Sequence, residues 1–234
     1  MCNAECIDFV DRMLGPELVE GRRILEVGSY DMNGSVRPTL ESRRPREYVG
    51  VDVVPGPGVD VVCAAEGLLD RFGPESFDIV VSTEMIEHVR DWRRVIRTLK
   101  GLCRPGGMVI VTTRSRGFPF HPAPHDFWRY EPEDMAAVFS DFEAVTIERD
   151  AESHPGVFVR ARRPTRLVET DLRPIALYSI VNSRRCADVS DLDVAVHRAR
   201  VRAAALSRAA KGRLAPARAR GAALRRRLAE RRGG

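Results

Sequence analysis

The chain has 234 residues, of which 44% are hydrophobic, enough for a buried core over most of its length. It contains no run of about 18 apolar residues, and its first residues include acids where a signal peptide is basic, so neither a membrane-spanning helix nor an export signal is expected. The net charge of +5 combines an acidic part, with 21 basic and 27 acidic residues over 1–165, and a basic part, with 17 basic and 6 acidic residues over 166–234.

Short apolar runs alternate with helical patterns over the acidic part of the chain. The first element is a helix near 4–14, because its apolar residues recur at helical spacing. Strand-like runs, rich in Val and Ile, cover 22–28, 47–54, 59–65, 77–83, 107–113, 142–149 and 156–162. Between them, 91–103 carries one apolar stripe with Asp91 as its predicted N-cap, and 131–141 begins with acids that favour a helix N-terminus.

The strand pattern predicts a mixed sheet. The first five strands are apolar almost throughout, as expected for strands that are buried on both faces of a parallel sheet. Only residues 150–155 separate the last two strands, too few for a helical crossover, so these strands should form an antiparallel hairpin at the sheet edge. The predicted fold class is therefore α/β, a Rossmann-like three-layer sandwich around a mixed seven-stranded sheet with a C-terminal antiparallel hairpin.

Composition divides the chain into three predicted parts. Residues 1–165 should form the globular domain, and 166–194 an accessory segment packed on it. Residues 195–234, with 13 basic residues and one acid, are predicted to be a basic Ala/Arg-rich tail that is helical or disordered. This tail is the one part suited to nucleic acid, but it lacks interleaved aromatic residues, which favours a solvated helix without a partner.

Two acids and a glycine end the first two predicted strands. Glu26 and Gly28 lie in "ILEVGSYDMNG", and Asp52 ends the second strand, where open α/β sheets bind their ligands. Gly28 permits a close backbone approach, whereas Glu26 repels phosphate and suits a cationic ligand. Asp52 follows Gly28 by 24 residues, a spacing typical of an acid that binds ribose hydroxyls. A cationic nucleoside without phosphates, such as S-adenosylmethionine, fits both acids.

The sequence resembles class I S-adenosylmethionine-dependent methyltransferases of the small-molecule type over about residues 22–163. "ILEVGSYDMNG" matches the first family motif, and "YVGVDVVPGPGVDVVCAAEGL" matches the second and third segments. The most specific match is "FDIVVSTEMIEHVRDWRRVIRTLKGLCRPGGMVIVTT", and "HDFWRY" recurs in a subset of these enzymes. The resemblance implies an enzyme that uses S-adenosylmethionine as its cofactor.

The resemblance also implies a set of cofactor contacts. These are Glu26, Gly28, Ser29, Asp52, Val53, Ala65, Glu66, Thr83, Glu84 and Met85. Two features depart from the family pattern. The usual second and third glycines of the first motif are Tyr30 and Met32, so this loop should be rearranged, and the acid that often contacts the adenine amine is absent at Ala64, where Glu66 or a backbone carbonyl is the expected substitute. These departures leave open a non-catalytic binding protein.

Methyl transfer to oxygen often needs a general base, and histidine is the usual one. His125, with Asp126 beside it in the loop after the fifth strand, is the first candidate. His88, which follows the fourth strand, is the second, and His121 shares the loop of His125. The alternatives are structural: His88 would order its loop, and His125 and Asp126 would pin theirs by a hydrogen bond.

The loop at 118–130 concentrates aromatic side chains, although only 6% of the chain is aromatic. Such a loop can form a lid over a planar or sugar-like acceptor. The predicted acceptor contacts are Phe120, Trp128, Arg129 and Tyr130. The alternative is a small satellite core beneath a long loop.

The five cysteines are odd in number and scattered, and Cys2 and Cys6 form the one close pair. Because structural zinc normally takes four ligands, no metal site is predicted, and Cys6 is interpreted as a buried helix residue. Reduced thiols and the missing export signal indicate a cytoplasmic protein.

The predicted function is methyl transfer from S-adenosylmethionine to a small-molecule acceptor, at an oxygen of a sugar or specialised metabolite. A nucleic-acid methyltransferase that uses the basic tail and a non-catalytic binding protein are the alternatives. The sequence predicts no membrane span and does not indicate the oligomeric state.

Overall fold

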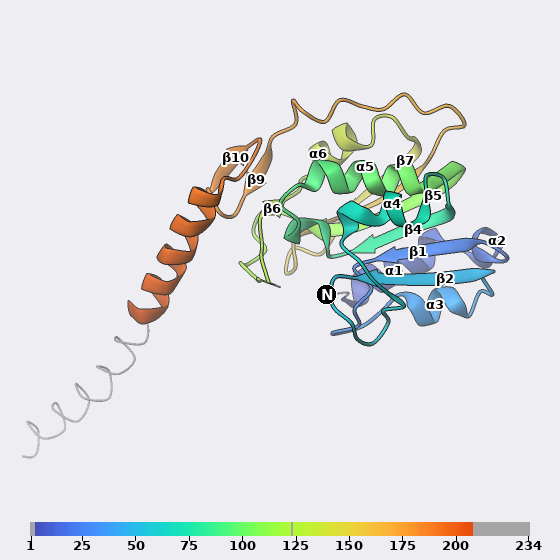
Figure 1. Cartoon of the computed structure of the whole chain (residues 1–234), viewed down its shortest axis with the longest axis horizontal. Coiled ribbons are helices and arrows are strands. Elements are labelled where there is room, and N and C mark those ends of the chain that lie inside the picture. The colour runs from blue at the N-terminus through green and yellow to red at the C-terminus, as the bar shows by residue number, and fades with distance from the viewer. Residues whose placement is uncertain (1–2, 123, 208–234) are drawn as a thin grey trace, which may run out of the picture. The chain divides into compact units, whose positions relative to one another are not determined.

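The computed structural model describes residues 3–122 and 124–207, and its main feature is a seven-stranded sheet flanked by helices (Figure 1). The helices are α1 (Ala4–Met13), α2 (Pro16–Val19), α3 (Arg37–Glu41), η1 (Ala65–Gly67), α4 (Leu68–Phe72), η2 (Ile86–His88), α5 (Trp92–Leu102) and α6 (Pro132–Val138). The strands are β1 (Arg23–Val27), β2 (Glu47–Asp52), β3 (Val61–Val62), β4 (Phe77–Thr83), β5 (Cys103–Arg114), β6 (Trp128–Arg129), β7 (Glu143–Arg149), β8 (Gly156–Arg162), β9 (Leu177–Ser179) and β10 (Arg184–Cys186).

The large sheet has the order β3-β2-β1-β4-β5-β8-β7. Among β1 to β5, all paired strands are parallel. β8 pairs with β5 in the antiparallel direction, and β7 pairs with β8 in the antiparallel direction. The predicted mixed sheet with a closing hairpin is therefore confirmed. The strand order reverses between β1 and β4, so the crevice at their carboxyl ends is where ligands bind in such sheets.

Burial explains why these strands lack an alternating pattern. Four of the five residues of β1 and six of the seven of β4 are buried. Every residue of β7, at the edge of the sheet, is exposed or half-buried. Continuous apolar sequence thus marks the central parallel strands, as expected for strands covered on both faces.

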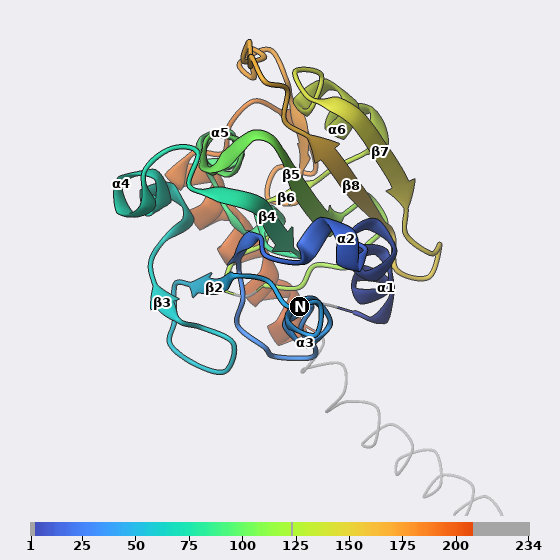
Figure 2. The ribbon, with the colours of Figure 1, turned by 90° about the vertical axis from the view of Figure 1, so that its right-hand side faces the viewer.

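Helices cover the sheet on both sides (Figures 1 and 2), with α4 and α5 over one face and α1 and α3 over the other. The apolar face of α1 buries Cys6, Phe9 and Val10, as predicted for the first helix. The Phe9 ring lies 5.3 Å from the Phe158 ring of β8, so α1 joins the core at the antiparallel end of the sheet.

Two helices begin with acids that the sequence predicted, Asp91 at the N-cap of α5 and the acids at the start of α6. Asp91 caps α5 by accepting a hydrogen bond from the Arg94 backbone N–H at 3.2 Å. α6 begins with a capping box, in which Asp134 accepts a hydrogen bond from the Glu131 backbone N–H at 3.0 Å. Both carboxylates satisfy N–H groups that the first turn of a helix leaves without partners.

A second, three-stranded sheet of order β10-β9-β6 was not predicted. Its strands have two or three residues each, too few for a readable alternation. Arg93 of α5 donates hydrogen bonds to the backbone carbonyls of Leu172 at 2.9 Å and Ala187 at 2.8 Å. These bonds hold the chain that carries β9 and β10 against the main body.

The chain forms two compact units, Met1–Val189 and Ser190–Gly234. In the second unit, residues 191–207 are helical, and the rest of the predicted basic tail, 208–234, lies outside the described residues. Over the described ranges, no helix combines the length and the apolar character that crossing a bilayer requires.

Candidate active site

Three parallel strands bring predicted cofactor residues together at the carboxyl edge of the sheet, the side formed by the carboxyl ends of the strands. Glu26 of β1 lies opposite Gly50 of β2 and Val81 of β4. Asp52 is the last residue of β2, and Thr83 is the last residue of β4. Because parallel strands end at the same edge, Glu26, Asp52 and Thr83 belong to neighbouring strand ends.

Glu26 is a buried carboxylate at this edge, with 2% of its surface exposed. The Tyr48 hydroxyl donates a hydrogen bond to its Oε2 at 2.8 Å. Burial raises the pKa of Glu26 to about 7, although the bond from Tyr48 acts in the opposite direction. A carboxylate with such a pKa is stabilised strongly by a cation next to it, for example the α-ammonium group of a bound amino acid.

The loop after β1 is shaped by Gly28, whose φ is +84°. A β-carbon at this position would lie 2.8 Å from Cβ of Met85, so glycine allows the segment after β4 to pack against the loop. Next to it, Ser29 is buried, and its Oγ finds no hydrogen-bond partner among the described residues. A ligand at the sheet edge can satisfy this hydroxyl, as buried polar groups generally require.

Asp52 faces the same loop. Its two carboxylate oxygens accept hydrogen bonds from the backbone N–H groups of Tyr30 and Val54, both at 3.2 Å. A carboxylate offers about four lone-pair sites, so two remain for a pair of vicinal hydroxyls. Beyond β3, the predicted adenine contacts Ala65 and Glu66 start η1, where Ala65 is buried.

Asp52→Ala is expected to weaken the binding of S-adenosylmethionine about 10- to 100-fold. The loss follows from hydrogen bonds to a charged acceptor, worth about 1.5–3 kcal/mol. Calorimetric titration measures it, and Asp70→Ala, which removes an exposed acid of α4, is the matched control. Unchanged affinity in Asp52→Ala would contradict the ribose assignment, and a wild type that binds no cofactor would favour the non-catalytic alternative.

Thr83, Glu84 and Met85, at the end of β4, were predicted together as cofactor contacts. Their side chains have different surroundings. Thr83 is buried, and Met85 packs against Gly28. Glu84 instead forms an ion pair with Arg114 and accepts a hydrogen bond from the Cys6 thiol at 3.4 Å. The Glu84 side chain thus ties the end of β4 to α1, and a cofactor contact of Glu84 stays a prediction. Val53, another predicted contact, is 60% exposed.

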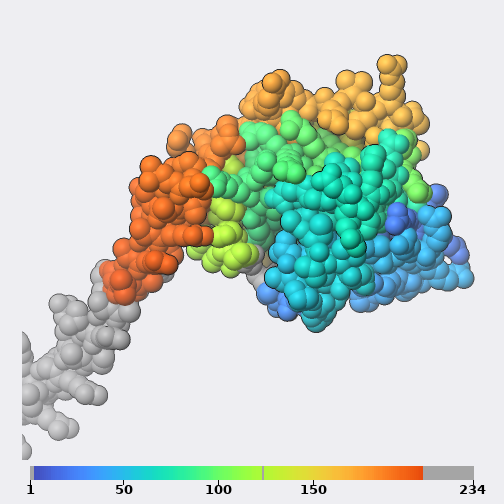
Figure 3. All heavy atoms as spheres, viewed as in Figure 1, coloured from blue at the N-terminus to red at the C-terminus, as the bar shows by residue number. Residues whose placement is uncertain are grey.

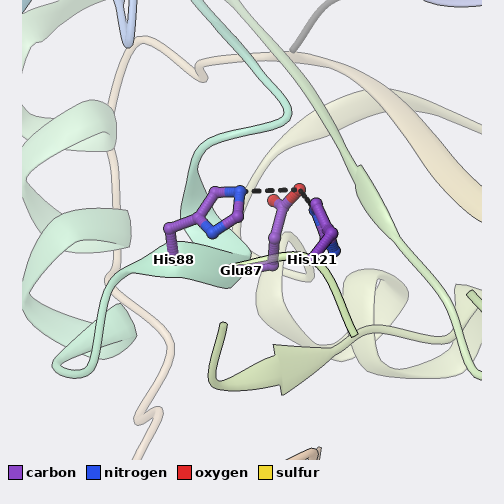
Figure 4. A group of neighbouring side chains, drawn as sticks. All are labelled: Glu87, His88 and His121. Carbon is purple, nitrogen blue, oxygen red and sulfur yellow. Dashed lines mark ion pairs between the residues drawn. The ribbon is translucent and has the colours of Figure 1, made fainter. Parts of the chain in front are cut away.

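Glu87, His88 and His121 form a cluster beyond the end of β4 (Figure 4). The Nε2 atoms of His88 and His121 each lie 3.8 Å from Oε1 of Glu87, and the two rings meet edge to face with their centroids 4.9 Å apart. Glu87 has no exposed surface, and its Oε2 accepts a hydrogen bond from Thr113 Oγ1 at 2.8 Å. Glu87 follows Met85 by two residues, and Met85 packs against Gly28 of the loop that follows β1.

Both imidazoles are anchored through Nδ1. His88 Nδ1 lies 2.5 Å from the backbone oxygen of His125, and His121 Nδ1 lies 3.2 Å from Oδ2 of Asp126. Burial alone would lower the pKa of His121, but Asp126 and Glu87 raise it to about 9. His121 and His88 in turn lower the pKa of Glu87 against the effect of its burial.

The Asp126 carboxylate, predicted to lie beside His125, pairs with Arg129 and His121. The Asp126 carboxylate is bound by the Arg129 guanidinium at 2.5 and 2.8 Å and accepts a hydrogen bond from the His121 backbone N–H at 2.9 Å. His125 contributes its backbone carbonyl to His88. Asp126 thus lies beside His121, with His88 on the other side of Glu87, and the roles of His125 and Asp126 in catalysis stay predictions.

The loop that leads to β6 reaches the molecular surface (Figure 3, yellow-green). Of the four predicted acceptor contacts, Phe120 is 41% exposed. Trp128, Arg129 and Tyr130 have no exposed surface. The burial of these three side chains favours the alternative of a small core beneath the loop. Acceptor contacts by all four residues stay predictions, and only Phe120 is exposed enough to make one without a rearrangement.

Sequence reasoning gave no chemical role to Glu87 or His121. Both were visible, since Glu87 precedes His88 directly after a predicted strand and His121 lies in the aromatic loop. The missing information was their proximity, which depends on how the loop after β5 folds back over the end of β4.

Comparison with known proteins gives one family. The methyltransferase domain family matches residues 3–158. Among curated proteins, the ubiquinone biosynthesis O-methyltransferase of Chromobacterium violaceum is 29% identical over 123 residues, which cover 47% of this chain and 50% of the relative. The enzyme of the same name from Pseudomonas entomophila is 33% identical over 124 residues, with the same coverage of 47% and 50%. The chain thus spans about half the length of the curated relatives that it matches.

Solved structures share the fold at low identity. Burkholderia thailandensis 1,6-didemethyltoxoflavin-N1-methyltransferase, with bound 1,6-didemethyltoxoflavin and S-adenosylhomocysteine, has a TM-score of 0.56 at 16% identity, covering 68% of this chain and 78% of that one. Haemonchus contortus phosphoethanolamine N-methyltransferase 2, in complex with S-adenosylmethionine, has a TM-score of 0.53 at 16% identity, covering 69% and 53%. At these identities the likeness concerns the fold alone.

Proposed function

Because the chain belongs to the methyltransferase domain family, whose enzymes take their methyl group from S-adenosylmethionine, we propose that it methylates a hydroxyl oxygen of a small molecule. The observation that carries this proposal is the cluster of Glu87, His88 and His121, which begins two residues beyond Met85, the residue that packs against Gly28. Two curated relatives named as O-methyltransferases support oxygen as the acceptor atom. A sugar or a specialised metabolite remains the proposed acceptor class.

The residues at the carboxyl edge fit the cofactor. When bound, S-adenosylmethionine supplies a methyl group that its sulfonium already makes electrophilic, so the protein mainly aligns the reactants and excludes water. We assign the ammonium group to Glu26, the ribose hydroxyls to Asp52 and a further polar contact to the unpartnered Ser29 Oγ. These three residues lie on the first two strand ends and the loop between them.

The cluster favours an oxygen acceptor over a neutral amine. A hydroxyl is a weak nucleophile until a neighbouring group removes or polarises its proton. His88 and His121 direct Nε2 atoms toward one buried carboxylate oxygen. The carboxylate belongs to Glu87, two residues beyond Met85, which packs against the loop that holds the cofactor in the proposal. An amine that is neutral at the working pH attacks without such assistance.

Release of S-adenosylhomocysteine, measured with matched hydroxyl and amine acceptors, tests the proposal. Turnover should require a hydroxyl, and mass spectrometry should detect the methyl ether. His88→Ala should lower turnover about 100- to 10,000-fold with cofactor affinity retained. His154→Ala, which removes an exposed imidazole from the β7–β8 loop, should keep the full rate. Methylation of amines without any methyl ether would contradict an oxygen acceptor.

His125→Ala separates the two histidine assignments. Because His125 contacts His88 through its backbone carbonyl, removal of its side chain should leave that bond intact. A full rate in His125→Ala together with a low rate in His88→Ala supports a catalytic role of the Glu87, His88 and His121 cluster. A low rate in His125→Ala together with a full rate in His88→Ala supports His125 as the base.

A further inference from the structure

We propose that Glu87, His88 and His121 form a binding site for one divalent transition-metal ion, with a carboxylate oxygen of Glu87 and the Nε2 atoms of the two histidines as ligands. The binding claim stands on the geometry of these side chains. The role of the ion in catalysis rests on the proposed function.

The three ligand atoms converge on a common point. Both Nε2 atoms lie 3.8 Å from Oε1 of Glu87, and the ligand atoms of the three residues all lie within 4.8 Å of one another (Figure 4). Metal–ligand bonds of about 2.0–2.1 Å in a tetrahedral site place neighbouring ligands about 3.3 Å apart. Movements of about half an ångström between Glu87 and each imidazole, and of up to about 1.5 Å between the two imidazoles, complete such a site.

The carboxylate of Glu87 provides a second, independent observation. Glu87 has no exposed surface, and its Oε2 is occupied by Thr113. Its Oε1 makes no hydrogen bond to any described residue and points between the two imidazoles. A buried carboxylate oxygen without a hydrogen bond is costly, and a cation between the rings offsets that cost.

The outer contacts match those of metal-binding histidines. The backbone oxygen of His125 binds His88 Nδ1 at 2.5 Å, and the Asp126 carboxylate lies 3.2 Å from His121 Nδ1. Metal-ligating histidines almost always place a carbonyl or carboxylate at the second nitrogen, because this acceptor fixes the ring and its tautomer. Arg129 holds Asp126 in place with two bonds, so the contact at His121 is itself rigid.

The ligand types define the class of ion. Two imidazoles with one carboxylate suit zinc, iron, manganese or cobalt, whereas magnesium and calcium prefer oxygen ligands. Three protein ligands leave at least one coordination position open, as in catalytic sites. In the proposed function, the acceptor hydroxyl would take this position, and the ion would lower its pKa so that its proton is released to solvent. The oxygen would then take the methyl group, with S-adenosylhomocysteine as the leaving group.

The test is to titrate the full chain with Co²⁺ and, separately, with Zn²⁺, both without S-adenosylmethionine. Visible absorption detects the binding of Co²⁺, and calorimetry detects the binding of Zn²⁺. We expect one ion per chain, and His121→Ala and Glu87→Gln should each weaken binding at least about tenfold. His154→Ala is the matched control, because it removes an exposed imidazole outside the cluster and should bind the ion like the wild type. Circular-dichroism melting verifies that each variant is folded.

Absence of binding to the wild type, or equal binding in His121→Ala and Glu87→Gln, overturns the proposal. In that case the cluster is an ion-pair network in which a proton on imidazole supplies the positive charge. Ion binding without methylation of any hydroxyl contradicts the proposed function but supports the metal site. Methylation of a hydroxyl without ion binding supports the proposed function but contradicts the metal site.

Discussion

Replacement of Arg129 with methionine is expected to lower the free energy of unfolding by about 3–5 kcal/mol. The side chains of Arg129 and Asp126 both have 0% of their surface exposed, and they pair through bonds of 2.5 and 2.8 Å. Methionine keeps an apolar stem of similar length but leaves the Asp126 charge buried without its partner. Burial opposes ionisation of Asp126, and Arg129 is the main group that holds its pKa low. Urea unfolding followed by circular dichroism gives the value.

A double variant isolates the cause. Asp126→Asn in the Arg129→Met background removes the unpaired charge, so the double variant should be more stable than the sum of the two single changes predicts. A loss below about 1 kcal/mol in Arg129→Met would contradict a desolvated pair, since this is the range of exposed ion pairs. Arg129→Met should also weaken metal binding, because Asp126 positions His121.

Glu26→Gln is expected to stabilise the protein above pH 7 relative to the wild type. The folded-state pKa of Glu26 is about 7 against an ordinary value of 4.5, with burial as the largest cause. The stabilising contribution of the protonated group is complete below pH 4.5 and is lost as the pH rises through 7, where the folded state must hold a buried carboxylate. The loss is about 3 kcal/mol, so the stability advantage of the variant should grow by this amount between pH 4 and pH 8.

The same substitution should abolish the pH dependence of cofactor binding. In the wild type, affinity for S-adenosylmethionine should rise up to tenfold per pH unit between about pH 5 and 7, because only ionised Glu26 attracts the ammonium group. Glu26→Gln should bind weakly at every pH. Calorimetric titrations across this range measure both curves, and a flat wild-type curve would exclude the contact between Glu26 and the ammonium group.

Tyr48→Phe is the control for Glu26. It removes the hydrogen bond at 2.8 Å that favours the charged carboxylate. The pKa of Glu26 should then rise further, and the increase in cofactor affinity should move to higher pH. A curve unchanged by Tyr48→Phe means that another group sets the dependence.

Much of the sheet could be predicted because its central strands are long and buried on both faces. The predicted strands at 77–83 and 156–162 coincide with β4 and β8. β5 begins at Cys103 rather than at 107, since the "RPGG" stretch enters the sheet through an irregular pairing with β4 instead of forming a loop. The short helices and β6, β9 and β10 were missed because they contain too few residues for either periodicity.

The candidate site likewise contains residues that the sequence could place and residues that it could not. Glu26, Gly28 and Asp52 could be placed from sequence because strand ends of a parallel sheet share an edge. Adjacency in sequence did not reveal that Asp126 pairs with Arg129 and His121, because these contacts depend on how the loop folds. The meeting of His88 with His121 depends on the path of the loop after β5, which hydrogen bonds from Phe127 N–H and Trp128 Nε1 to the segment after β4 determine.

The pairing of β6 with β9 matters for protein engineering. Trp128 and Arg129 end the loop that carries Phe120, and they pair with Ser179 and Tyr178 of β9. β9 lies downstream of residue 158, where the family match stops. A shortened gene that stops after β8 removes β9, the strand on which the end of the loop rests. A chimera that exchanges only the loop between relatives keeps β9 but pairs it with a loop of different sequence. Libraries aimed at new acceptors should therefore diversify both stretches together.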